Sequence, residues 1–101
     1  MIWTDQTTYK RGDTERIPTT WHCALTDKVS FLVHKHIYYG DAWLLTCNYL
    51  GVERLDLGTT ELESAKARAT LKMRDLLNKK KAEINAAISE LLWPHEGEIE
   101  A

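Results

Sequence analysis

The chain has 101 residues, a formal net charge of −2, and a content of 44% hydrophobic and 28% charged residues. This length predicts one domain, and the composition is that of a globular protein rather than a disordered one. The small negative charge argues against a general polyanion binder, although it leaves room for a local basic patch. No stretch approaches the roughly 20 apolar residues of a membrane span, and residues 1–5 do not resemble a signal peptide, so we expect a cytoplasmic protein.

Residues 1–19 form a polar leader in which Gly12 and Pro18 interrupt any regular pattern. They predict an extended N-terminal arm or, alternatively, a short edge strand around Trp3–Tyr9. Trp3 is expected to dock on the body of the protein, because large apolar side chains in a polar leader are seldom left in water. At the other end, residues 94–101 predict an acidic tail.

Residues 20–57 alternate with a period of two and are rich in β-branched and aromatic side chains, which predicts an antiparallel meander. The expected strands are Thr20–Leu25, Val29–Tyr38 and Ala42–Tyr49, with a short fourth strand at Val52–Leu57.

Two three-residue turns would fix the register of this meander. Trp21 would then lie opposite Val33 in the first hairpin, while Val33 and Ile37 would face Cys47 and Trp43 in the second. This register gathers the large apolar groups on one face, whereas a slip of one residue would turn them into water.

The same register keeps the two cysteines apart. Cys23 and Cys47 lie on flanking strands with a third strand between them, which separates them by almost 10 Å. A disulfide requires Cα atoms within about 7 Å, so we predict two reduced cysteines.

From Thr60 onward the hydrophobic period becomes helical. Thr60 and Glu63 have the spacing of a capping box, and Thr59 offers the same cap one residue earlier. The predicted apolar stripe is Leu62, Ala65, Ala69, Met73 and Leu76. The helix should end before Pro94, because the residue before a proline disfavours helical geometry.

These elements predict an α+β fold: a three- to four-stranded antiparallel meander, followed by one long C-terminal helix packed on one sheet face. Residues 20–93 would form this single domain. The expected core places one set of sheet residues (Trp21, Phe31, Val33, Trp43, Leu45) against one set of helix residues (Leu62, Ala65, Ala69, Met73).

The predicted helix is too long for the predicted sheet. A helix from Glu61 to Leu92 would measure about 48 Å, against about 26 Å for a strand of eight residues. Charges at Lys79–Lys81 interrupt the stripe, and a new apolar stripe follows. We expect Ile84, Ile88 and Leu91 to bind a partner, most simply in a homodimer. The alternative is that Trp3 and Ile17 of the arm fold back over this stripe.

Two other groups of residues are candidate binding sites. Tyr38 and Tyr39 occupy a predicted exposed turn, where paired tyrosines either anchor an interface or cover a sheet edge. The basic residues of the helix could track phosphates, or could simply form a solvated face balanced by nearby carboxylates. These residues are Arg68, Lys72, Lys79, Lys80 and Lys81.

The sequence offers little for catalysis. His22, His34 and His36 could share one sheet surface and hold zinc, yet same-face neighbours on a strand are nearly 7 Å apart. A solvent-facing polar surface is the simpler interpretation. No nucleophile elbow or glycine-rich phosphate loop is present, and buried cysteines disfavour the thiolate form. We therefore expect no catalytic residue, metal or cofactor.

Four segments (21–25, 31–34, 42–47 and 62–69) read WHCAL, FLVH, AWLLTC and LESAKARA. Together they resemble small accessory proteins of phages and prophages, in which a short antiparallel sheet leads into an ExAKxxA helix. The resemblance spans residues 20–77 and rests on general patterning. It implies binding to a host protein in the host cytoplasm, including inhibition of bacterial defence systems. The order of elements also resembles a double-stranded-RNA-binding domain without its first helix, but residues 59–63 are acidic where that family is basic.

Three functions are therefore open. The first is a non-catalytic protein-binding module, such as a phage-type inhibitor of a host protein. The second is a nucleic-acid-binding accessory protein that uses the basic helix surface and would bind less tightly as salt rises. The third is a metal-dependent enzyme built on the three histidines.

Overall fold

The computed structural model describes residues 1–9 and 17–92 of the chain. Within these residues it contains five strands, one short 3-10 helix and one long α-helix, so the predicted α+β class is confirmed. The predicted acidic tail and part of the predicted arm lie outside the described residues. The chain divides into two compact units, residues 1–71 and residues 72–101, and each is described by itself.

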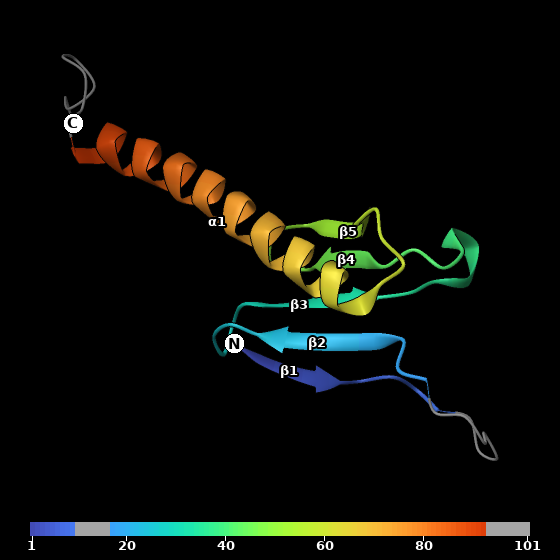
Figure 1. The fold of residues 1–101 in the computed structure, drawn as a ribbon. Helices are drawn as coiled ribbons and strands as arrows, with labels where there is room; N and C mark the ends of the chain where they lie inside the picture. Colours follow the sequence, from blue (N-terminus) through green and yellow to red (C-terminus); the bar gives the residue numbers. More distant parts are fainter. Residues whose placement is uncertain (10–16, 93–101) are drawn as a thin grey trace. The chain divides into compact units, whose positions relative to one another are not determined.

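The five strands form one antiparallel sheet in which each strand pairs with the next along the chain (Figure 1). The strands are β1 (Ile2–Asp5), β2 (Thr20–Ala24), β3 (Ser30–His34), β4 (Leu44–Cys47) and β5 (Val52–Asp56). The sheet therefore has one strand more than the maximum of four that the sequence predicts. The additional strand is β1, which extends the sheet along the free edge of β2.

The predicted register is right in the first hairpin and wrong in the second. Trp21 pairs with Val33 as expected, but Val33 pairs with Leu45 and not with Cys47. The reason is that β3 ends at His34, well before Tyr38, and a 3-10 helix η1 (Ile37–Tyr39) lengthens the connection to β4. The register moves by two residues, so each side chain stays on its predicted face.

A bulge irregularity distinguishes the β5 edge of the sheet. The pairing of β4 with β5 shifts between Leu45 and Cys47, and Arg54 has a positive φ of 51°. The hydroxyl of Thr46 accepts a hydrogen bond from the Arg54 amide at 3.0 Å. This bond replaces regular ladder pairing at the bulge, which leaves the β5 edge twisted and irregular.

The core lies mainly on one face of the sheet, where the register aligns the apolar positions of the strands. Phe31 and Val33 are buried there, and Trp3 packs edge-on against Phe31 with ring centroids 5.4 Å apart. The docking of Trp3 is therefore confirmed. The opposite face is not uniformly solvated as predicted, because Leu44 lies on it beside His34 and is fully buried.

The helix α1 (Leu62–Leu92) runs without interruption through the lysine run that the sequence left as a possible break. At its start the hydroxyl of Thr59, the alternative cap, accepts a hydrogen bond from the Glu61 amide at 3.1 Å, in place of the capping box of Thr60 and Glu63. We call residues 62–71 the proximal segment, which belongs to the first unit, and residues 72–92 the distal segment, which belongs to the second.

The proximal segment covers the apolar face of the sheet. Ala65 and Ala69 are completely buried, since small side chains allow a helix to approach a sheet closely. The Lys66 ammonium lies 4.1 Å from the centre of the Trp21 ring. Just before the helix, the Trp43 indole N–H donates to the carbonyl of Thr60 at 3.1 Å. Within the first unit, most of the predicted core residues are buried, but Trp21 and Leu62 are only partly buried.

Candidate functional site

The distal segment presents an apolar stripe to solvent. Ile84, Ile88 and Leu91 are 47%, 45% and 82% exposed, and their spacing of four and three residues places them on one side of the helix. Every described residue from 78 to 92 is exposed. We call Ile84, Ile88 and Leu91 the distal stripe.

Two lysines lie at the N-terminal end of the distal stripe. Lys80 and Lys81 precede Ile84 by four and three residues, so both lie beside the stripe at its N-terminal end. Both lysines are exposed. The stripe thus combines branched apolar side chains with a positive end, which suits a groove that has an acidic rim.

The predicted tyrosine pair lies on the 3-10 helix η1 in the first unit. Tyr38 is 83% exposed and Tyr39 is 46% exposed. His36 caps this helix, because its Nδ1 accepts a hydrogen bond from the Tyr38 amide at 3.2 Å. The His36 ring also lies 5.2 Å and 5.6 Å from the two tyrosine rings.

Ile37 joins this exposed group, although the sequence placed it in the core opposite Trp43. It is 86% exposed. The alternating pattern of residues 29–38 gave no sign that the strand ends at His34. The only available signal was the Tyr-Gly-Asp turn, which is compatible with both a tight hairpin and a longer loop.

The basic residues of the helix share one side only in part, because Lys72 and Lys79 are seven residues apart and lie on the same side, whereas Lys80 and Lys81 point in other directions. The guanidinium of Arg68 donates from Nη1 to the carbonyls of Leu57 and Gly58 at 2.9 Å and 2.8 Å, so it fastens the helix start to the preceding turn. Lys72 and Lys79–Lys81 are all exposed. Successive residues of a helix are about 100° apart, so the three lysines of the run point in three directions.

The three histidines serve three different local roles. His22 lies on the open sheet face, His36 caps η1, and Nε2 of His34 lies 2.7 Å from the Thr46 hydroxyl. Burial lowers the pKa of His34 below its ordinary value, which favours the neutral ring. Among the residues that the structure describes, no three histidine, cysteine or carboxylate side chains are grouped to hold a metal ion.

Both cysteines are buried free thiols, as predicted. Burial raises the pKa of the Cys23 thiol, which disfavours the reactive thiolate. The Cys47 thiol donates to the carbonyl of Ser30 at 3.4 Å. These surroundings give the two side chains a packing role.

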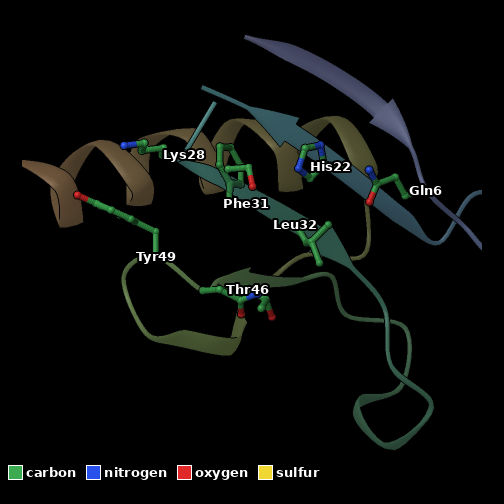
Figure 2. A pocket seen from close by; sticks show the side chains of 9 residues that line it. Gln6, His22, Lys28, Phe31, Leu32, Thr46 and Tyr49 are labelled. Atoms are coloured by element: carbon green, nitrogen blue, oxygen red, sulfur yellow. The ribbon is translucent and has the colours of Figure 1, made fainter. Parts of the chain in front are cut away.

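A shallow depression of about 450 Å³ occupies the open face of the sheet (Figure 2). Its lining mixes side chains from the strands with others from the turns and from the segment after β1: Gln6, His22, Lys28, Ser30, Phe31, Leu32, Thr46, Asn48 and Tyr49. His22 is the one imidazole in this lining, and no carboxylate or thiol accompanies it. Such a lining can accept polar contacts but provides no acid–base pair.

Comparisons with family models, with curated proteins and with solved structures give no match to this chain. In the described part of the chain, no helix has both the length and the apolar character that crossing a membrane requires.

Proposed function

We propose that this protein is a non-catalytic protein-binding module whose distal stripe docks into an apolar groove of a host protein. The observation that carries this proposal is the joint exposure of Ile84, Ile88 and Leu91 on one side of a continuous helix. Branched apolar side chains at this spacing are the anchors of the helix-in-groove mode of recognition. The phage-type resemblance favours a host protein, including a component of a defence system, as the partner.

The charges beside the stripe specify the chemistry of the partner further. Lys80 and Lys81 stand at one end of the stripe, so an acidic rim on the partner's groove would fix the direction in which the helix lies. Burial of the three anchors supplies affinity, at roughly 25 cal/mol for each Å² of apolar surface removed from water. The lysines add selectivity and a faster association rate.

The test is affinity capture from the native host, followed by mass spectrometry. The bait is the wild-type chain beside two doubly substituted chains, Ile84→Asp/Ile88→Asp and Asn85→Asp/Ser89→Asp. Both variants add two negative charges four residues apart on the distal segment, but only the first places them on the stripe. We expect the first to lose a partner that the wild type and the second both retain. Equal recovery by all three baits would contradict the proposal.

Nucleic-acid binding is the second outcome that this experiment can reveal. The exposed Lys79–Lys81 run could contact phosphates, yet its three directions around the helix do not track one backbone. If nuclease treatment removed the captured material and capture weakened steeply with salt, the basic surface would be the functional one.

A further inference from the structure

The two edges of the sheet differ in how they are protected. The β5 edge carries a bulge, a residue with positive φ and the charged side chains of Glu53 and Arg54, all of which obstruct pairing with a further strand. The β1 edge has the sequence Ile-Trp-Thr-Asp and pairs regularly with β2 along all four residues. Of the two, only β1 offers a regular ladder to another strand.

The hydrogen-bond pattern shows which groups of β1 face outward. The Gln6 amide donates to the Thr20 carbonyl at 2.9 Å, so the backbone groups of Gln6 face β2. Because these directions alternate along an antiparallel strand, the amides and carbonyls of Trp3 and Asp5 point away from the sheet. A strand beside β1 would meet two donors and two acceptors.

A groove accompanies this edge on the face that the proximal segment covers. Its volume is about 530 Å³, and its lining joins β1 to the helix: Trp3, Glu63, Lys66, Ala67, Thr70 and Leu71. The Lys66 ammonium lies 5.3 Å from the centre of the Trp3 ring. The groove therefore has a mixed lining, in which the Lys66 ammonium lies beside Trp3 and 3.8 Å from the exposed carboxylate of Glu63.

We propose that a second copy of this chain occupies this edge, so that two β1 strands pair antiparallel about a twofold axis and form one ten-stranded sheet. Placing Thr4 on the axis sets Trp3 opposite the partner's Asp5 and Asp5 opposite the partner's Trp3. Each outward amide then meets an outward carbonyl, giving four backbone hydrogen bonds. The register is self-complementary, as a twofold contact requires.

Charge complementarity selects a second copy over an unrelated strand. Asp5 and Trp3 lie on the same face of β1, so the pairing brings the partner's Asp5 beside Trp3, where Lys66 lies. Hydrogen bonds from Thr7 and Tyr9 hold the pKa of the Asp5 carboxyl below its usual value, which keeps it ionised at neutral pH. Two carboxylate–ammonium pairs thus form across the axis. The residues that carry this contact all belong to the first unit, so the inference does not rest on the proposed function.

The sheet offers an internally matched pair of variants for the test. Asp5→Pro removes an outward amide of β1, and Asp56→Pro removes the corresponding outward amide of β5. Both carboxylates accept a hydrogen bond from the amide two residues later, at 2.9 Å and 2.7 Å, and Asp5 additionally accepts one from the Tyr9 hydroxyl at 2.7 Å. In sedimentation across micromolar concentrations, we expect the wild type and Asp56→Pro to dimerise. Asp5→Pro should dimerise at least about 30-fold less tightly, because two backbone bonds are lost per dimer together with both Asp5–Lys66 pairs.

Two further measurements keep the proposal testable if Asp5→Pro fails to fold. Thr4→Cys should form an intermolecular disulfide on mild oxidation, since position 4 meets itself on the axis, whereas Glu53→Cys on the other edge should not. Asp5→Lys should weaken the dimer, and Asp5→Lys/Lys66→Glu should restore it.

Three results would overturn the β1 dimer: a monomeric wild type at high micromolar concentration, no preference for the Thr4→Cys crosslink, or dimerisation that survives Asp5→Pro but not Ile84→Asp/Ile88→Asp. The last result would place the dimer contact on the distal stripe.

Discussion

The two segments of helix α1 share one continuous backbone, but the proximal segment has buried side chains whereas most of the distal segment is exposed. The proximal segment contains two fully buried alanines, and its Arg68 side chain binds the carbonyls of the preceding turn. From residue 78 onward the distal segment has only exposed side chains, although isoleucine and leucine recur there at helical spacing. Apolar spacing alone therefore does not identify a core. In the proximal segment the buried positions carry alanine, while the exposed distal stripe carries the large branched residues expected of binding anchors.

The largest expected effect concerns the anchorage of the helix start. Trp43 is 3% exposed and its indole N–H donates to the Thr60 carbonyl. Trp43→Ala should lower the free energy of unfolding by about 3–5 kcal/mol, because it leaves a cavity and an unpaired carbonyl. Denaturant titration measures this loss. A change below about 1 kcal/mol would mean that packing of Trp43 contributes little to holding the helix start on the sheet. The contrast between a packed proximal segment and an exposed distal segment would then be wrong for the proximal segment.

A matched pair of alanine substitutions separates the two segments directly. Ala69→Leu should cost about 1–3 kcal/mol, because the added carbons have no space at a fully buried position. Ala86→Leu makes the same change at an exposed position of the distal segment and should alter stability by less than about 0.5 kcal/mol. Thermal unfolding of both variants gives the difference. Equal costs would show that the two segments are packed alike.

The contact between Arg68 and the turn before the helix can be tested by a substitution at Gly58. Gly58 has a φ of 70°, and a Cβ there would lie 3.1 Å from the Arg68 guanidinium. Gly58→Ala should cost about 1–2 kcal/mol for the left-handed backbone, and should also weaken the contact that fastens the helix. Gly51→Ala, with a φ of 69° and open space around it, is the control for the backbone cost alone. If the two variants are equally stable, Arg68 contributes nothing measurable.

The smallest effect is a pH dependence in the first unit. The pKa of His34 is lowered by burial, so the unfolded chain binds the proton more readily than the folded one. Stability from this group is complete above the ordinary histidine pKa of about 6.5 and declines as the pH falls below that value. Unfolding titrations at several pH values should show this decline, and His34→Gln should reduce it. His22→Gln, on the same sheet face, is the matched control; an unchanged decline in the His34 variant would contradict the assignment.

The sequence predicts those parts of the fold that depend on local periodicity. The change of period near Gly58, the pairing of Trp21 with Val33 and the buried cysteines all follow from spacing and are all observed. The second hairpin was mispredicted because η1 continues the apolar alternation past the end of β3, so periodicity does not mark the boundary. The predicted count of three to four strands was too low because β1 is short and polar, so the sequence offered it only as an alternative to an extended arm, and its pairing with β2 depends on a contact distant in sequence.

Of the candidate surfaces, the sequence locates the distal stripe but not the roles of Arg68 and Ile37. The distal stripe follows from helical spacing and from the mismatch between helix and strand lengths, so the sequence suffices to locate it. The role of Arg68 could not be predicted, because it depends on where the carbonyls of Leu57 and Gly58 point. Likewise, the exposure of Ile37 depends on a loop conformation that the alternating pattern conceals.

The most direct test of the account is the free energy of unfolding of the Ile84→Asp/Ile88→Asp variant, measured by denaturant titration at a protein concentration where the association state is known. The account treats both isoleucines as exposed binding residues, so it predicts a value within about 0.5 kcal/mol of the wild type. A loss of more than about 2 kcal/mol would mean that both side chains belong to the folded core. In that case the distal stripe could not be the surface that binds a partner.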